Sequence, residues 1–411
     1  MSISLTQVIT NLQADIDAVD SDTSMDQILK YMHRARSLTE INSVYDSVGV
    51  MPTDSAYDGM LAFSKSDNTM YKFVDSSIDG GTIFAWHQAD SAIAPGPAAQ
   101  PYEGSPYQGQ SRAYVFGGNF ENEIQKVLYS SDGNATDVAD AHPSGLMGAM
   151  PGLSDTHGYI LGGRTPPNSY INTIQRFPYA SEGNAADAGY DLVQAVYSGN
   201  STAIGNRDKI YNTGGTGPAA PDHYERITHS SLSNATDVGN LTPGGLWGQF
   251  MGGASSTTKG YTLGGRYSGS TGGTNAYYSF PFASEGNMVD TANLTTNLYY
   301  NSGASSNEDG YSMGGQRLSP SSLRFLTIDK FPFAAEGNAS YSNDMQLSPG
   351  SGISRTTASS SPSFGYVYGG NTGPSAAIND IQKFPFASVA AIADVGDLIT
   401  AENRDMGATD V

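Results

Sequence analysis

Apolar and polar positions along residues 107–411 follow a pattern that repeats about every 50 residues. A short aromatic or apolar stretch ends in two glycines, as in "GYILGG" and "GYTLGG", and the six copies are separated by 45, 52, 50, 50 and 55 residues. A period of about 20 to 50 residues is typical of solenoids, propellers and arrays, in which each unit stacks on the next. The repeated glycines are Gly117, Gly118, Gly162, Gly163, Gly214, Gly215, Gly264, Gly265, Gly314, Gly315, Gly369 and Gly370.

A second block with constant internal spacing follows each glycine pair. In "RFPYASEGNAADAGYDL", Phe177 precedes Asn184 by seven residues, and all six copies keep this gap. Because one inserted residue would turn every side chain of a strand to the wrong face, the constant gap predicts a hairpin of fixed register. We expect "SEGN" to be its turn, with Gly and Asn at positive φ. The recurring turn residues are Asn134, Asn184, Asn234, Asn287 and Asn338, and the last copy has Ala391 instead.

Each unit therefore predicts one glycine-pair strand, two strands around the turn, and a fourth strand in the Ser/Thr/Gly-rich link. Four short antiparallel strands that repeat radially make a propeller, whereas a linear β-solenoid usually has a shorter period. The sixth unit ends before a further glycine-pair strand, and the missing strand lies at 109–118. We expect a mainly β chain whose six-bladed propeller is closed by strands from both ends of the domain, which removes open sheet edges.

Residues 1–106 do not share the repeat. Apolar positions recur at helical spacing over 5–19 and 28–38, which predicts two helices. "GMLAFSKSDNTMYKFVD" (59–75) predicts a β-hairpin, and the segment 91–106 is rich in Pro, Gly and Ala, as linkers are. The predicted organisation is a helical and β-hairpin domain over 1–90, a linker over 91–106 and a propeller over 107–411.

Composition narrows the class of function. The formal charge of −20 and the lack of a basic cluster argue against binding of nucleic acid, and the absence of cysteine excludes thiolate chemistry and disulfides. The first residues lack the pattern of a secretion signal, and no apolar run approaches the roughly 18 residues that span a membrane. We expect no secretion signal and no membrane insertion.

Candidate catalytic and metal residues are few. The six histidines form no H-x-x-x-H or H-x-H pair, and no G-x-S-x-G motif is present. Recurrent acids three residues after the Asn position could line a calcium site, but they lack the usual ligand spacing, so we favour Asx-type turns. We therefore expect no catalytic residues, no metal and no cofactor. The acids are Asp137, Asp187, Asp237, Asp290 and Asp394.

Aromatic residues at loops of a ring could stack on sugars, although aromatic residues on strands more often pack between blades. The candidate ligand-binding residues are Trp247, Tyr170, Tyr224, Tyr267, Tyr277 and Tyr299, with Tyr278 and Tyr300 as further candidates.

The glycine pair after an apolar strand resembles the kelch repeat, whose members form propellers of this period. Kelch units also carry a Trp at a set position, whereas this chain has only Trp86 and Trp247. The phrase "FPFAS" with "EGN" is similar to repetitive virion proteins of tailed phages of marine bacteria, over residues 107–411. This second resemblance implies a non-enzymatic structural virion protein, such as a tail, fibre or appendage protein.

In that interpretation, residues 1–90 dock on other virion proteins of the tail, neck or capsid, and the propeller faces outward to attach to a glycan of the host surface. Several copies or a homo-oligomer would compensate for weak single-site binding. An intracellular bacterial kelch-like scaffold that binds a protein partner is the alternative. A propeller glycosidase or lyase remains a third, because paired carboxylates can come from different blades.

Overall fold

The computed structural model divides the chain into two compact units, Met1–Glu103 and Gly104–Val411. The boundary after Glu103 falls within the segment that was predicted as a linker. In the first unit the structure describes 41–45, 61–64, 69–75 and 84–88. In the second it describes 108–197, 201–206, 208–218, 222–229, 231, 233–242, 248–267, 272–318, 323–346, 352–373, 376–389, 392–402 and 406–410.

The first unit contains one sheet with the strand order β1-β2-β3-β4. Its strands are β1 (Ile41–Tyr45), β2 (Leu61–Ser64), β3 (Thr69–Asp75) and β4 (Phe84–Gln88). β1 runs parallel to β2, and β2 and β3, in the segment predicted as a hairpin, pair antiparallel. The two helices predicted before residue 40 lie outside the described residues.

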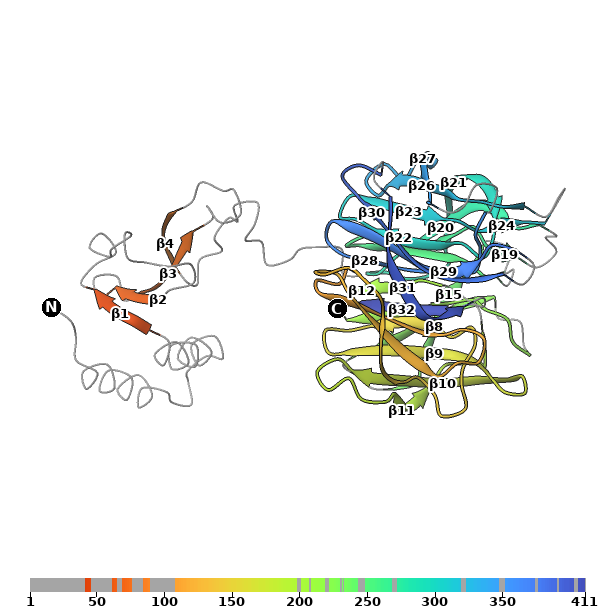
Figure 1. The fold of residues 1–411 in the computed structure, drawn as a ribbon, viewed down its shortest axis with the longest axis horizontal. Coiled ribbons are helices and arrows are strands. Elements are labelled where there is room, and N and C mark those ends of the chain that lie inside the picture. The colour runs from red at the N-terminus through yellow and green to blue at the C-terminus, as the bar shows by residue number, and fades with distance from the viewer. Residues whose placement is uncertain are drawn as a thin grey trace. The chain divides into compact units, whose positions relative to one another are not determined.

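The second unit is a β-propeller with six four-stranded blades (Figure 1). Blade 1 is β32 (Met406–Asp410), β5 (Arg112–Gly117), β6 (Glu123–Leu128) and β7 (Thr136–Asp140). Blade 2 is β8 (Met150–Leu153), β9 (His157–Thr165), β10 (Ser169–Pro178) and β11 (Ala186–Asp191). Blade 3 is β12 (Ile204–Asn206), β13 (Lys209–Thr213), β14 (His223–Thr228) and β15 (Thr236–Asn240).

The remaining three blades repeat the same order. Blade 4 is β17 (Gly252–Ser255), β18 (Lys259–Leu263), β20 (Thr274–Pro281) and β21 (Val289–Leu298). Blade 5 is β22 (Ser302–Ser305), β23 (Asp309–Met313), β26 (Thr327–Pro332) and β27 (Ser340–Asp344). Blade 6 is β28 (Thr357–Ser360), β29 (Phe364–Asn371), β30 (Ala377–Pro385) and β31 (Ala393–Glu402).

The ring closes where the two ends of the propeller meet in one sheet. β32 pairs antiparallel with β5, so blade 1 takes its first strand from the C-terminal segment and its other three from the start of the domain. The first strands lie on the inside of the ring. Each strand in the order β12, β17, β22, β28, β32 and β8 contacts the next, and β8 contacts β13 of blade 3, which completes the circle. The predicted six blades, the fourth strand in the link and the closure by both ends are confirmed.

The glycine pairs sit at the end of the second strand of every blade. Both glycines of each pair have a positive φ, between 52° and 112°, a region that residues with a Cβ atom enter only at a cost. At Gly162 the surroundings add a second restriction, because a Cβ atom there would lie 2.6 Å from the carbonyl oxygen of Val196. The pair is therefore required by both the turn of the chain and the close approach of the next link.

A buried cluster of apolar residues fills the space between each pair of neighbouring blades. In blade 3, Tyr211 lies on β13, two residues after Lys209 at the start of that strand. Its ring stacks on Phe282 of blade 4, with the ring centroids 5.4 Å apart and an angle of 11° between the planes. Tyr261 stacks in the same way on Phe333, at 5.1 Å. The ring of the second aromatic residue in each "FPF" or "FPY" phrase thus stacks on a tyrosine of the preceding blade, which explains why the phrase recurs.

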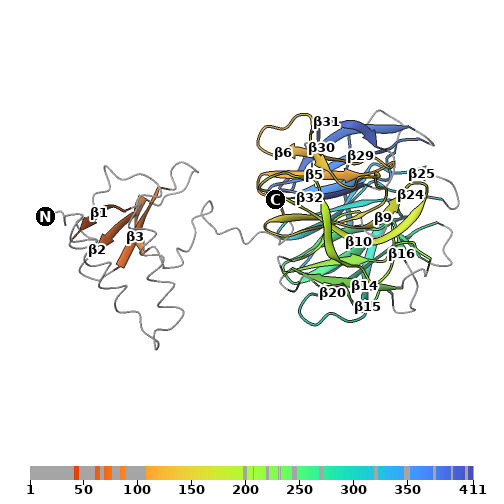
Figure 2. The same cartoon turned by 90° about the horizontal axis from the view of Figure 1, so that it is seen from below.

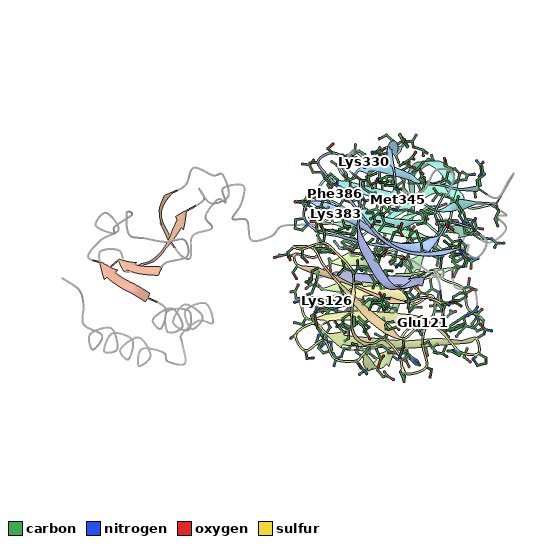
Figure 3. The ribbon with its side chains drawn as sticks, in the orientation of Figure 1. Glu121, Lys126, Lys330, Met345, Lys383 and Phe386 are labelled. Carbon is green, nitrogen blue, oxygen red and sulfur yellow. The ribbon has the colours of Figure 1, made fainter. Side chains whose placement is uncertain are left out.

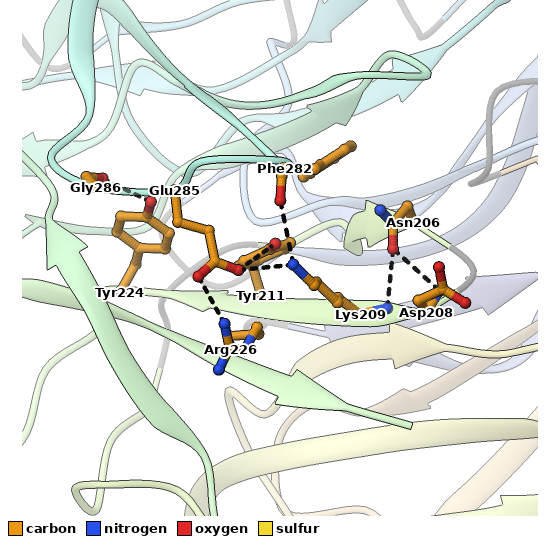
Figure 4. Close-up of polar contacts among 9 residues, drawn as sticks. All are labelled: Asn206, Asp208, Lys209, Tyr211, Tyr224, Arg226, Phe282, Glu285 and Gly286. Carbon is orange, nitrogen blue, oxygen red and sulfur yellow. Dashed lines mark hydrogen bonds and ion pairs between the residues drawn. The ribbon is translucent and has the colours of Figure 1, made fainter. Parts of the chain in front are cut away.

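The acidic residue of the turn binds the same preceding blade (Figure 4). Glu285 accepts hydrogen bonds from the Tyr211 hydroxyl at 2.9 Å, from Lys209 at 3.1 Å and from Arg226 at 2.7 Å. Burial alone would raise the pKa of Glu285, but these three donors outweigh it and hold the pKa below its usual value. Glu182 and Glu336 make equivalent contacts with blades 1 and 4.

The recurring asparagines also connect adjacent blades. The side-chain carbonyl of Asn184 accepts a hydrogen bond from the backbone N–H of Asp140 at 3.0 Å, and the next N–H, that of Ala185, donates to the carbonyl oxygen of Asp140 at 2.8 Å. Asn134 makes the same contact with Asp397 and so joins blade 1 to blade 6. The contacts of the other three run from Asn234 to Asp191, Asn287 to Asn240 and Asn338 to Asn293.

One prediction about the turn is wrong. None of the five repeated asparagines has a positive φ; that conformation belongs to the acidic residue, with φ of 48° at Glu182 and 54° at Glu285, and, as predicted, to glycine at Gly133 and Gly286. The asparagine instead uses its amide to bind the neighbouring blade, which one repeat alone could not reveal. The Asx-type turns are confirmed at Asp187, Asp237 and Asp394, whose carboxylates accept the N–H two residues later at 2.8 to 3.2 Å.

We predict that Glu285→Gln lowers the free energy of unfolding by about 1–3 kcal/mol at pH 7, because a neutral amide replaces a carboxylate with three donors. The folded pKa is lowered, so the carboxylate contributes its full stabilisation above its ordinary value of about 4.5 and loses it as the pH falls through the folded value. Urea unfolding at pH 7 and at pH 3.5 measures both effects, and the difference between variant and wild type should shrink at the lower pH.

Glu308→Gln is the matched control. Glu308 is exposed, and among the described residues its carboxylate has no partner, so this variant should unfold like the wild type at both pH values. Equal stability of Glu285→Gln and Glu308→Gln would contradict the role of the turn carboxylate.

Candidate functional site

The strand order gives the propeller two different faces. The segments after the glycine pairs and the links that lead to the first strands gather at one end of the ring, which we call the glycine-pair face. The turns after the first strands and the "SEGN" turns lie at the other end, the turn face. Two small sheets extend the glycine-pair face, and Figures 1 and 2 show their strands along the same edge. They pair β16 (Gly248–Gln249) with β19 (Arg266–Tyr267) and β24 (Gln316–Arg317) with β25 (Leu323–Arg324).

At the turn face, the chain itself covers part of the inner ring. Gln108 is buried and its side-chain amide donates to the carbonyl oxygen of Ser305 at 2.6 Å, and the N–H of Gly109 donates to Ser360 at 2.8 Å. Ser305 and Ser360 end the first strands β22 and β28 at this face. The polypeptide therefore enters the propeller across the turn face, and the glycine-pair face carries no such segment among the described residues.

Three bulky residues in the links that lead to first strands at the glycine-pair face have a left-handed backbone. Phe250, Tyr300 and Arg355 each lie two residues before the first strand of a blade and have φ of 60°, 59° and 62°. Blade 2 has Gly148 at this position, with φ of 66°. This conformation costs a residue with a side chain about 1–2 kcal/mol, so the three side chains are kept here at the expense of stability.

The backbone and rings of these residues join into a belt across three blades. The N–H of Tyr300 donates to the carbonyl oxygen of Phe250, and that of Arg355 donates to Tyr300, both at 2.8 Å. The rings of Phe250 and Tyr300 lie 4.0 Å apart, and the Arg355 guanidinium lies 4.1 Å from the Tyr300 ring. Aromatic rings stacked with a guanidinium gain cation–π attraction.

The belt continues toward blade 2. The ring of Tyr197 lies 6.4 Å from that of Phe250, and the guanidinium of Arg164 lies 4.4 Å from Tyr197 and 5.6 Å from Tyr170. All of these side chains except Phe250 are partly exposed to solvent. We call this set the aromatic–arginine arc, and it consists of Arg164, Tyr170, Tyr197, Phe250, Tyr300 and Arg355.

The two faces use different cations. Every described lysine of the propeller lies toward the turn face and binds a carboxylate, as Lys126 binds Glu182 at 2.8 Å. Figure 3 shows Lys126, Lys330 and Lys383 along the edge opposite to β24. The described arginines of the glycine-pair face that have no carboxylate oxygen within 4.0 Å are Arg164, Arg317, Arg324 and Arg355. The lysines of the propeller are thus paired with carboxylates toward the turn face, where Arg176 is the arginine without such a partner among the described residues, and these four arginines leave positive charge unpaired at the glycine-pair face.

The structure separates the tyrosines that the sequence proposed as ligand-binding residues. Tyr224 and Tyr277 are fully buried, and their hydroxyls donate to Gly286 and Gly337 of the next blade at 2.7 Å. Tyr267 and Tyr299 are also buried. The side chains of these four tyrosines are buried, so the structure does not present their rings to solvent.

Two of the remaining aromatic candidates belong to the arc. Tyr170 lies at its blade 2 end, and Tyr300 lies in the belt. Trp247 lies outside the described residues. The sequence reasoning missed Tyr197, Phe250, Arg164 and Arg355. An arginine directly after a glycine pair was a visible signal for Arg164, whereas Phe250 and Arg355 lie in links that do not align between repeats.

Metal sites and membrane-spanning helices are two further features that bear on function in the described part of the chain. There, no group of three or more His, Asp or Glu residues could hold a metal ion. Within the same residues, no helix is both long enough and apolar enough to cross a membrane. Neither a family model nor a curated protein matches the sequence.

We predict that Tyr300→Gly is more stable than Tyr300→Ala by about 1 kcal/mol, because both lose the ring and only glycine accepts a φ of 59° without cost. Thermal and urea unfolding of the two variants measure the difference. At a position with an ordinary extended backbone, Ala would be the more stable of the two, and that order would contradict the left-handed conformation at Tyr300.

Proposed function

We propose that the protein is a non-enzymatic binding protein whose propeller attaches to a glycan of a host-cell surface through the aromatic–arginine arc. The observation that carries this proposal is the row of partly exposed rings at one face of the propeller. Flat rings bind the apolar faces of sugars, and an exposed row of them offers several contacts to a chain of sugar units. Phe250, Tyr300 and Arg355 bring their side chains together at this face although each has a left-handed backbone, which also supports the proposal.

The wider setting that we propose is the particle of a tailed phage, in which the protein is a structural component of the tail or head. The similarity of the repeat phrase to repetitive virion proteins supports this setting, and so does the division of the chain into two units. The first unit would bind other virion proteins, and the propeller would face outward. Several copies on one particle would raise the overall affinity by multivalency.

For attachment, we expect the full-length protein to bind members of a glycan array. Tyr300→Ala should lose about tenfold or more of that affinity, because the stacking of a sugar on one aromatic ring contributes a large part of the affinity of a single site. Tyr341→Ala is the control, since Tyr341 lies exposed on the outer strand β27, 55% accessible. Both variants should keep the unfolding temperature of the wild type within a few degrees.

Equal loss in both variants, or binding that does not depend on Tyr300, would contradict the arc as the site. Release of reducing sugar ends from a bound polysaccharide would instead favour the glycosidase or lyase alternative.

For the phage setting, we expect an antibody against the propeller to label the tail or head of particles in immunogold electron microscopy of the source culture. Its position would separate a tail appendage from a capsid decoration. Particles without label, given an antibody that recognises the native protein, would contradict the virion setting and favour the intracellular kelch-like scaffold.

A further inference from the structure

The arginines at the glycine-pair face call for a chemical explanation. The chain has 40 acidic and 20 basic residues, so a carboxylate partner would be easy to provide. Each described lysine of the propeller has one, yet Arg324 and Arg355 have none within 4.0 Å. Among the described arginines, Arg164 and Arg317 of the glycine-pair face also have none, and toward the turn face Arg176 is without one.

Two of these guanidinium groups lie side by side at the blade 6 end of the arc. Arg324 donates from Nε to the hydroxyl of Ser354 at 3.2 Å, which places it at the residue next to Arg355. It also donates to the carbonyl oxygen of Gly373 at 3.0 Å. Burial lowers the pKa of Arg324, and the nearby positive charge of Arg355 lowers it further. Like charges at close range repel each other, and an anion bound between these two groups would relieve the repulsion.

The Arg355 guanidinium retains its full donor capacity. Among the described residues it has no hydrogen-bond acceptor, and it lies over the ring of Tyr300 at 4.1 Å. A guanidinium held flat against a ring still presents N–H donors at its edge, in the geometry that binds two oxygens of one carboxylate or sulfate. Ring and donors therefore meet at one point of the arc.

The other end of the arc repeats the combination. Arg164 stacks on Tyr197 and Tyr170, and one of its terminal nitrogens donates to Asn168 at 2.6 Å. Its Nε is buried without a partner in the described structure. The row of rings is therefore flanked at both ends by guanidinium groups without a carboxylate partner, which suits a chain of sugar units that bears negative charges.

We propose that the arc binds an anionic glycan, whose sugar rings stack on Tyr197 and Tyr300 and whose carboxylate or sulfate groups bind Arg164, Arg324 and Arg355. This inference rests on the proposed glycan attachment and specifies the class of the ligand. Carboxylate and sulfate share the oxygen geometry that guanidinium recognises, and the experiment distinguishes them.

The test is an array on which acidic glycans are printed beside their neutral parents, with separate carboxylated and sulfated series. The full-length protein should bind anionic members about tenfold or more above the neutral parents, since charge-assisted hydrogen bonds are among the stronger polar contacts. Arg355→Gln and Arg324→Gln should each remove most of this preference, and 0.5 M NaCl should weaken it. Arg176→Gln, which removes the same charge from β10 near the turn face, should bind like the wild type.

The outcomes separate the two proposals. Binding of neutral parents as strongly as acidic glycans, with dependence on Tyr300, would overturn the anionic class and leave glycan attachment in place. Absence of binding to every glycan by folded protein, as judged by its unfolding temperature, would overturn both. Loss of preference in Arg176→Gln as well would show that net charge, and not the arc, selects the ligand.

Discussion

The contact of each "SEGN"-type turn segment with the preceding blade is the interaction on which the rest of the structure depends. A four-stranded sheet has two faces and cannot bury both by itself, so every blade relies on its neighbours. The turn segment supplies all parts of the junction: an aromatic ring for the tyrosine, an acid for its hydroxyl, and an amide for the outer strand. Because these groups contact a neighbouring blade at fixed distances, the number of residues between them cannot change. The loops at the other end of the ring make no such set of contacts, and their length can vary.

The sequence predicted those features that recur with a constant spacing. The glycine pairs, the turn at "SEGN", the six blades and their closure all follow from periodicity, since every copy repeats the same local requirement. Contacts between repeats were harder to predict. Asn184 carries the residue type of a turn with positive φ, but its amide binds Asp140 of another blade, and only the arrangement of the blades brings these two residues together.

The candidate site was only partly predictable for a related reason. Buried Tyr224 and partly exposed Tyr300 are the same residue type in similar aromatic surroundings, and burial is decided by which blade faces them. Phe250 and Arg355 lie in links whose length and sequence vary between the repeats, so aligning the repeats does not mark these two residues as equivalent. They become equivalent only through their shared left-handed backbone ahead of the first strands. At the turn face, the described lysines of the propeller are paired with carboxylates. At the glycine-pair face, the residue types in the links vary from blade to blade.

The closure of blade 1 also imposes an order on the synthesis of the protein. β5, β6 and β7 leave the ribosome before all other strands of the ring, but the edge of β5 has no partner until β32 follows about 290 residues later. During that interval an unpaired strand edge is exposed, and such edges pair readily with other chains. A nascent chain that stalls before β32 would therefore be both incomplete and adhesive, which gives the cell's proteases and chaperones a means of telling finished from unfinished molecules.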